Sequence, residues 1–478
     1  MNFIVYDLIL LVIFGIFMSV FLYTRRKKIK KEGLLLLYKS NWGIKLIEKV
    51  SKKYKKTLKV LSYVSIFTGY VLMILMIYFF ARIIFIYLFR PEIIRAIKIP
   101  PIMPLIPYLP QAFKLDFLPP FYFIYWIIII AIIAIPHELA HGFYAAYNKI
   151  KIKNTGFGFF PFFLPVFLAA FVEPDEKQMK KTSKFSQMSI LSAGTFANIL
   201  TAFLFFILLV LFFITCFSPA GIVFDNYAYS VVSISAPITL NGNLIENTSY
   251  DNLLDSMNDD LNEIEINENK YLITKMAINN SETREYYEEY SKLVLFDEAP
   301  AIKSQLVGVI SEIDNELITS KEKLSEVLDN KEIRQEVVIK TIFENKETEY
   351  NLILEEHPEV PGKAWIGIGF INAEPQGILG RVTSTFSFFK KPDVYYKANF
   401  SSATFFYNLL WWIVLISFSV ALINMLPVGI FDGGRFFFLT IAGITGSEKI
   451  AKKVFTGITF LFLALLGLIM FFWLFSFF

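Results

Sequence analysis

The chain is poor in the side chains that usually build metal sites and cross-links, because its 478 residues include one cysteine and three histidines. The single cysteine, Cys216, excludes an intramolecular disulfide and any zinc site made of thiolates. We interpret it as a small apolar residue of a membrane helix rather than as a reactive thiol. Three histidines are also too few for a diiron centre of the desaturase type, which needs many imidazole ligands.

Charged residues are scarce as well, at 18% of the chain, whereas 55% of the residues are hydrophobic and the mean hydropathy is +0.52. This composition is too apolar for an ordinary soluble protein and predicts a polytopic membrane protein. The length allows two or more domains. A nucleic-acid partner is not expected, because membrane topology accounts for the basic residues.

Six apolar segments are long enough to cross a bilayer. They are Phe3–Tyr23, Leu61–Phe89, Phe121–Tyr147, Gln187–Phe217, Thr404–Leu426 and Val454–Phe477. The first is followed directly by RRKKIKK and lacks a small-residue cleavage site, so we read it as a retained helix rather than a signal peptide. The positive-inside rule places residues 24–60, 148–186 and 447–453 in the cytoplasm, and both chain ends outside.

The charges are distributed unevenly along the chain. Residues 221–380 hold 30 Asp and Glu against 12 Lys and Arg, whereas the rest holds 12 acidic and 34 basic residues. We therefore expect a separate, extracytoplasmic soluble domain. The expected division is an N-terminal membrane region (1–120), a first half-core (121–217), the acidic domain (218–397) and a second half-core (398–478).

One part of the acidic domain has a pattern that predicts its secondary structure. A strand at Val307–Ile310 is followed by a turn at Asp314-Asn315, a helix that opens at Ser320, and a β-hairpin in EVVIKTIFENKETEYNLILEE. This order resembles a PDZ domain, in which a strand and a helix form a groove for an added peptide strand. Residues 225–296 receive no fold assignment. The predicted fold class is a polytopic α-helical membrane protein with an inserted α/β PDZ-like domain.

The stretch Gly156–Phe171, GFGFFPFFLPVFLAAF, is apolar but too short and too interrupted by Gly and Pro for a spanning helix. We interpret it as a re-entrant or interfacial hairpin. Its edge could pair with an extended peptide.

The third apolar segment carries the sequence HELAH. On a helix, His137 and His141 are four residues apart and face one side, which suits two nitrogen ligands of one Zn²⁺. Glu138 lies beside them and could take a proton from a water that the metal activates. The alternative is a pair of hydrogen-bonded core histidines. A glutamate and two histidines are costly in a membrane segment unless they have a function, so we favour the metal site.

A third ligand is expected from the end of the fifth segment, NMLPVGIFDGGR. Pro427 and Gly429 should end the helix before Asp432. An aspartate there needs a partner, which the incomplete zinc site supplies, although a surface aspartate in a Gly-rich turn is the alternative. Counted from the outer ends of their segments, His137 and Asp432 both fall in the cytoplasmic half of the membrane, so they could meet.

HELAH followed by NMLPVGIFDGG resembles the site-2 protease family of intramembrane zinc metalloproteases, and SAGTFAN is similar to a motif on that family's middle core helix. The resemblance covers about residues 120–217 and 400–446. It implies His137, His141 and Asp432 as zinc ligands and Glu138 as general base and acid. It also implies that Asn424 holds the substrate backbone or the oxyanion. Asn198, the last residue of SAGTFAN, is a candidate to touch the substrate or to join helices.

The expected function is therefore hydrolysis of peptide bonds in or near transmembrane segments of a membrane protein. The PDZ-like domain could bind a peptide. Three alternatives are disfavoured. A membrane HExxH protease of another family would take a later glutamate as third ligand, and no such membrane-located candidate follows HELAH. A non-catalytic scaffold would have no need of Glu138. A transporter is disfavoured because the segments show no inverted repeat.

Overall fold

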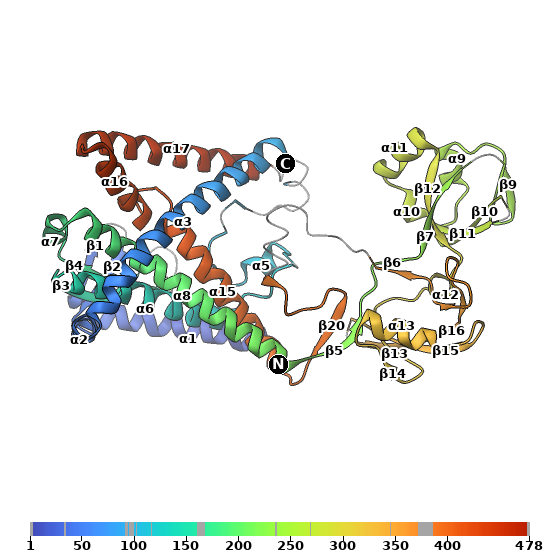
Figure 1. Ribbon diagram of the computed structural model, residues 1–478, viewed down its shortest axis with the longest axis horizontal. Helices are drawn as coiled ribbons and strands as arrows, with labels where there is room; N and C mark the ends of the chain where they lie inside the picture. Colours follow the sequence, from blue (N-terminus) through green and yellow to red (C-terminus); the bar gives the residue numbers. More distant parts are fainter. Residues whose placement is uncertain are drawn as a thin grey trace. The chain divides into compact units, whose positions relative to one another are not determined.

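The computed structural model describes the chain except for a set of short stretches. These are residues 1–2, 33–34, 91–93, 95–99, 102, 116, 160–167, 235–236, 268, 345, 371–385 and 476–478. The chain forms two compact units, which are described separately (Figure 1). The membrane unit comprises Met1–Phe212 and Thr404–Phe478, and the soluble unit comprises Phe213–Ala403.

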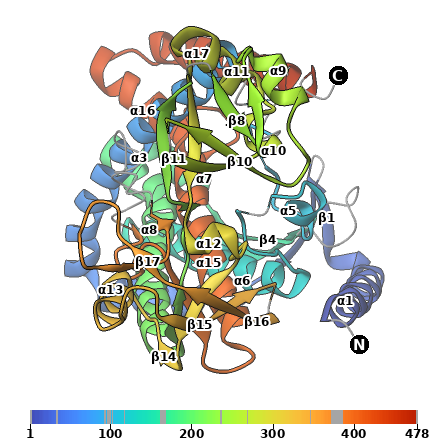
Figure 2. The ribbon, with the colours of Figure 1, turned by 90° about the vertical axis from the view of Figure 1, so that its right-hand side faces the viewer.

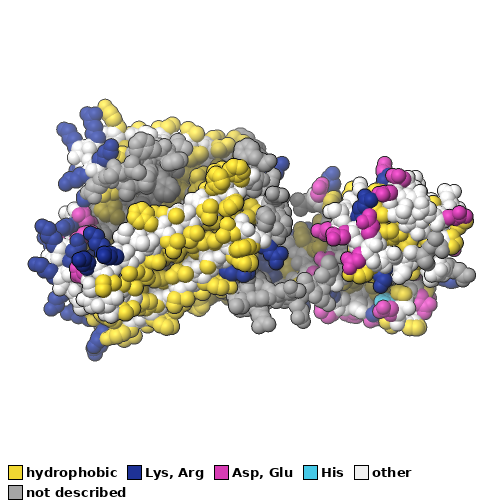
Figure 3. Space-filling model, turned by 90° about the horizontal axis from the view of Figure 1, so that it is seen from above, with side chains coloured by type: hydrophobic (Ala, Val, Ile, Leu, Met, Phe, Trp, Pro, Cys, Tyr) yellow, Lys and Arg dark blue, Asp and Glu magenta, His cyan; other side chains and the backbone are white. Residues whose placement is uncertain are grey.

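Six helices of the membrane unit are long and apolar enough to cross a bilayer, which confirms the predicted fold class. They are α1 (Phe3–Thr24), α3 (Lys55–Phe89), α6 (Phe123–Tyr147), α8 (Lys184–Cys216), α15 (Ala403–Asn424) and α17 (Glu448–Phe475). Hydrophobic side chains cover much of the surface along these helices, and basic side chains gather at one end of the unit (Figure 3). This distribution is expected of a protein surface that contacts lipid and has basic residues at one boundary of the membrane.

The first helix is tied to the helix that carries HELAH by a buried carboxylate. Asp7 in α1 is 3% exposed and accepts hydrogen bonds from the backbone N–H groups of Phe123 (2.7 Å) and Ile124 (3.0 Å), and from the hydroxyl of Tyr108. The first N–H groups of a helix have no partner within the helix. Asp7 therefore caps α6 from a different helix, and sequence reasoning did not detect it.

A four-stranded antiparallel sheet lies beside α6. It is built from β1 (Ile29–Glu32), β2 (Leu35–Ser40), β3 (Ile152–Phe159) and β4 (Leu168–Pro174), in the order β1-β2-β3-β4. The pair β3–β4 forms the two sides of the predicted hairpin, whose turn falls in residues 160–167, outside the described residues. Gly156 permits close approach of β2, because a Cβ there would lie 2.0 Å from the carbonyl oxygen of Tyr38. Strands β1 and β2 lie within residues 24–60, the basic stretch for which the sequence predicted no strand.

Two further helices pack against the helices of the core. Helix α2 (Ile44–Lys53) places the fully buried Ile47 against Gly142 of α6, and Ser51 Oγ donates to the carbonyl of Phe143 at 3.0 Å. Helix α3 approaches α8 at Gly69, where a Cβ would lie 3.1 Å from the Cβ of Ser192. The N-terminal region thus supports the half-cores on which the motifs lie.

The soluble unit contains the predicted PDZ-like elements in a second module, and an unpredicted first module (Figure 2). The second module has β13 (Val309–Ile313), β14 (Glu316–Leu317), α13 (Lys321–Asp329), β15 (Glu336–Phe343) and β16 (Lys346–Ile353), joined by β5 (Phe217–Ile222) and β20 (Val394–Ala398). Its sheet order is β16-β15-β13-β5-β20, with β14 on β13. The Ser320 hydroxyl accepts from Lys323 N–H, as the predicted helix start requires. The arrangement is consistent with an inserted PDZ-like domain.

The first module occupies the stretch that the sequence left unassigned. It has β7 (Tyr229–Ser233), β8 (Ile238–Leu240), β9 (Asn243–Ile245), α9 (Tyr250–Asp255), β10 (Leu261–Ile266), β11 (Asn269–Thr274), α10 (Lys275–Ile278), α11 (Ser281–Tyr290) and β12 (Lys292–Asp297). Its sheet order is β7-β12-β11-β10-β8-β9. The remaining short elements among the described residues are η1 (Arg26–Lys28), α5 (Leu109–Ala112), α7 (Glu176–Lys181), β6 (Asn226–Tyr227), α12 (Pro300–Lys303), β17 (Glu355–Glu356), β18 (Ala364–Trp365), β19 (Ile368–Gly369) and α16 (Asp432–Thr445).

The two modules repeat one arrangement: strand, tight turn, strand, short helix and β-hairpin. The turn residue Asn241 donates its N–H to the carbonyl of Glu263 (2.8 Å), and its Oδ1 accepts from the N–H of that residue (2.9 Å). Asp314 makes the same two bonds with Val338, at 2.9 and 2.8 Å. Residues 238–274 therefore repeat the arrangement of the half that resembles a PDZ domain.

Replacing Asp7 with alanine should lower the free energy of unfolding of the protein in detergent by about 2 kcal/mol, because two buried N–H groups lose their acceptor. The measurement is thermal unfolding followed by circular dichroism. Val12→Ala is the matched control, since Val12 lies on the same helix and is 60% exposed. Equal effects of the two substitutions would contradict the capping role of Asp7.

Candidate metal centre

Helix α6 places both histidines of HELAH on one side. The Nε2 atoms of His137 and His141 lie 3.1 Å apart, and the helix runs through Pro136 to Tyr147 without interruption. The i, i+4 spacing that the sequence indicated is thus realised. Glu138, the next residue after His137, lines the same cavity as the two imidazoles.

Asp432 reaches the histidines from the beginning of α16. Its Oδ2 lies 3.3 Å from His141 Nε2 and 3.6 Å from His137 Nε2. One ligand atom from each of the three residues lies within 4.8 Å of the others, so the group could hold a metal ion. The structure thus brings together the three residues that the resemblance implied as ligands.

The chain reverses tightly between α15 and α16, as Pro427 and Gly429 indicated. Gly433 and Gly434 make this possible, because a Cβ at Gly433 would lie 2.3 Å from the backbone carbon of Met425. At Gly434 it would lie 2.3 Å from the carbonyl oxygen of Val428. At the other end of α16, Lys184 Nζ donates to the carbonyl of Ala442 at 2.6 Å. Both ends of the helix that carries Asp432 are therefore held.

Each histidine has a second partner that orients its ring. His141 Nδ1 lies 2.7 Å from the carbonyl oxygen of Ile190, to which it donates, leaving Nε2 free for a metal. Asn198 Nδ2 lies 3.0 Å from His137 Nδ1. A metal on Nε2 requires a proton on Nδ1, so the amide of Asn198 must then present its oxygen to that proton.

The centre opens into a cavity of about 1310 Å³ within the membrane unit. Apolar side chains of α6 and α15 line one part of it, among them Trp126, Ile129 and Ile416. Strand β4 forms another wall, and among the described strands β4 pairs with β3 alone, so its other edge is free. The N–H of Val172 on that edge donates to Glu138 Oε2 at 2.9 Å.

Glu173 on the same strand also lines the cavity. Burial disfavours its charged form, but hydrogen bonds from Asn154 and from Lys39 outweigh burial and lower the pKa of Glu173. This carboxylate is therefore ionised and held by its partners, whereas Glu138 is the glutamate that directly follows the ligand His137 on α6.

The chain matches the pattern of Peptidase family M50 over residues 125–466. It belongs to Peptidase family M50. The match includes HELAH, the fifth span and Asp432, and it confirms the resemblance to the site-2 protease family. A search of the curated proteins finds no match.

The structure places the two remaining candidate residues of this M50 chain differently. Asn424, at the end of α15, is half-buried and lines the cavity, where a substrate would reach it. Asn198 also lines the cavity, but it is fully buried and its contact is with His137, so its position suits orientation of a ligand better than contact with substrate.

Gly194 is a site residue whose importance the sequence did not reveal. A Cβ at this position of α8 would lie 2.4 Å from His141 Nε2 and 2.6 Å from His137 Nε2. A side chain there would thus occupy the space of the metal ligands. The available signal was its place in SAGTFAN, four residues and thus about one helical turn before Asn198.

Gly194→Ala should abolish stoichiometric metal binding, because the added methyl group displaces both imidazoles. The measurement is metal content of the protein purified in detergent. Gly443→Ala on α16 is the matched control, since nothing lies within 4 Å of a Cβ there, and it should keep full metal content. Full metal content in Gly194→Ala would refute this steric argument.

Asn198→Ala should weaken metal binding by about 10- to 100-fold, the usual effect of removing a partner of a ligating histidine. Asn198→Asp keeps an oxygen acceptor and should bind metal more tightly than the alanine variant. Competition with a chelating dye measures both. Thr201→Ala is the control, because the Thr201 hydroxyl donates to Ala197 within its own helix. Equal affinity of the alanine and wild-type proteins would exclude the orienting role.

Proposed function

We propose that this M50 protein is a zinc-dependent intramembrane endopeptidase that cleaves peptide bonds in or near transmembrane segments, as in regulated intramembrane proteolysis. The observation that carries the proposal is the convergence of His137, His141 and Asp432 beside Glu138, on helices of a membrane unit and inside a cavity. Two imidazole nitrogens and a carboxylate oxygen suit zinc, with one position left for water or substrate.

A bound zinc ion would act as a Lewis acid and lower the pKa of water in the site. Glu138 is the residue that moves the proton. Its Oε2 is held by Val172 N–H, which keeps the carboxylate directed into the cavity. From there Glu138 would take a proton from the attacking water and deliver it to the leaving amine.

The substrate must be extended at the scissile bond, since the carbonyl of a helical peptide is shielded by its own turn. The free edge of β4 offers backbone groups for an added strand, and this strand runs along the cavity that contains Glu138. We propose that the substrate pairs with β4 at Ala170–Phe171, beside the Val172 N–H that donates to Glu138. Asn424, across the cavity, would then hold the backbone or the oxyanion.

The membrane orientation follows from the basic loops under the positive-inside rule. We propose that the metal centre lies near the cytoplasmic face and that the soluble unit is extracytoplasmic. The PDZ-like modules would bind a peptide or restrict access of substrates with large ectodomains. The alternative of another membrane HExxH family is disfavoured, because the ligand that meets the histidines is Asp432 and the family match is to M50.

Glu138→Gln should abolish cleavage of a single-span test substrate while keeping zinc, because the amide cannot accept a proton. A loss of at least about 100-fold is expected for removal of a general base. Cleavage is measured in proteoliposomes and zinc by elemental analysis. Removal of zinc by a chelator should abolish cleavage, and added zinc should restore it.

His357 provides the matched control for the two ligating histidines. It lies in the soluble unit, where its Nδ1 accepts from the N–H of Glu359, so His357→Ala should retain zinc and activity. His141→Ala should lose both. Equal cleavage by the wild type and Glu138→Gln, or absence of stoichiometric zinc in the wild type, would overturn the proposed function.

A further inference from the structure

The cavity around the metal centre has a strongly cationic part. In contrast to the apolar walls of α6 and α15, this part is lined by five basic side chains: Lys39, Lys153, Lys177, Lys180 and Arg435. They come from β2, from the β3–α7 region and from α16. Segments far apart in the sequence thus contribute positive charge to the lining of one cavity.

Two of the five cations are neutralised by neighbouring carboxylates. Lys39 Nζ lies 2.9 Å from Glu173, and Lys153 Nζ lies 3.6 Å from Asp175. The other three, Lys177, Lys180 and Arg435, form no ion pair within the described part of the chain. We call these three residues the cationic mouth.

Three of the four carboxylates that line the cavity are engaged with other residues: Glu138 with the N–H of Val172, Asp432 with the two histidines and Glu173 with Lys39. The fourth carboxylate is that of Glu176. Lys177 and Lys180 are exposed, so they can meet an incoming chain at the entrance. Their charges are therefore available to a ligand.

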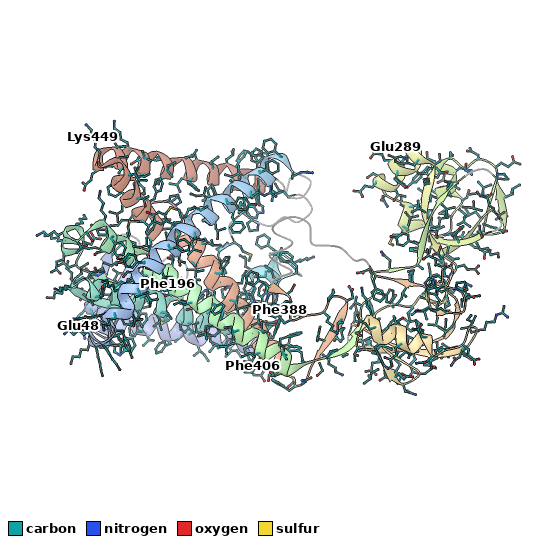
Figure 4. The ribbon with its side chains drawn as sticks, in the orientation of Figure 1. Glu48, Phe196, Glu289, Phe388, Phe406 and Lys449 are labelled. Atoms are coloured by element: carbon teal, nitrogen blue, oxygen red, sulfur yellow. The ribbon has the colours of Figure 1, made fainter. Side chains whose placement is uncertain are left out.

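Membrane topology alone does not explain Arg435. It lies one turn after Asp432 on α16 and lines the cavity with it, whereas the basic residues Lys449, Lys452 and Lys453 of α17 are exposed and lie outside the cavity lining. Figure 4 shows Lys449 at the end of the membrane unit. Exposed basic residues such as those of α17 are sufficient for contact with lipid headgroups, and this contact does not require an arginine in the cavity lining.

Resting on the proposed function, we propose that the cationic mouth selects substrates whose segment next to the scissile transmembrane region is acidic. A substrate chain that leaves the metal centre on this side passes Lys177, Lys180 and Arg435. Acidic side chains there gain partners, and basic side chains meet like charge. Most membrane proteins have basic cytoplasmic flanks, so this repulsion would spare them from cleavage.

The test compares three single-span substrates that differ only in four flanking residues, which are all Asp, all Ser or all Lys. Full-length protein is reconstituted in vesicles of zwitterionic phosphatidylcholine, so that lipid charge makes no contribution. The wild type should cleave the acidic substrate about tenfold faster than the basic one, as expected for a few partly exposed charge pairs. High salt should reduce this ratio.

The variant K177E/K180E/R435E should invert the preference, so that the Lys-flanked substrate is cleaved fastest. The matched control is K449E/K452E/K453E, which makes the same charge change outside the cavity and should keep the wild-type ratio. Zinc content reports whether each variant is folded. If the triple variant loses zinc, K177E/K180E leaves α16 intact and should still reduce the ratio.

Different results separate this proposal from the proposed function. Cleavage of all three substrates at one rate, dependent on Glu138, would overturn the charge selection and leave the protease assignment standing. An equal shift by the α17 control would assign the effect to general surface charge and also overturn it. Loss of the preference in vesicles of anionic phosphatidylglycerol would assign the cations to lipid headgroups. No Glu138-dependent cleavage of any substrate would overturn both proposals.

Discussion

The cost of placing polar groups in a membrane governs the construction of this protein. Two histidines, a glutamate and an aspartate lie on helices whose other side chains are suited to lipid, and each polar group has a partner that offsets this cost. The partners must also leave the Nε2 atoms available. The carbonyl of Ile190 and the amide of Asn198 meet this demand by binding the opposite ring nitrogens.

Bringing two half-cores into contact requires very close helix packing at a few points. Gly194 lies directly against the ligating imidazoles, Gly69 brings α3 onto α8, and Gly142 receives Ile47 from α2. Interior packing of this density leaves little room for adjustment, so an added methyl group at such a point would disturb the geometry of the metal centre. The first two spans therefore have a structural role for the site, although they carry none of its ligands.

The free edge of β4 is a hazard in most proteins, because unpaired backbone groups invite aggregation. Here the edge faces the cavity of the metal centre, and one of its N–H groups is taken by Glu138. The same backbone that positions the base thus lies where a substrate strand would be presented. Such an edge would bind a substrate through backbone hydrogen bonds, which do not depend on the side chains of the substrate. Sequence preference would then come from charges such as those of the cationic mouth.

The sequence by itself determined the features that depend on local or compositional physics. The six spans follow from hydropathy, the histidine pair from helical spacing, and the Asp314 turn with its Ser320 cap from local hydrogen bonding.

Only the tertiary structure decided what depends on contacts between distant segments. These include the cap of α6 by Asp7, the pairing of β1 and β2 with β3, and the contact of Gly194 with the imidazoles. The similarity between the two modules of the soluble unit was also visible only in the tertiary structure. It lies in strand register and backbone hydrogen bonds, which different side chains can support. Such contacts are set by packing in three dimensions, which no local pattern of residues encodes.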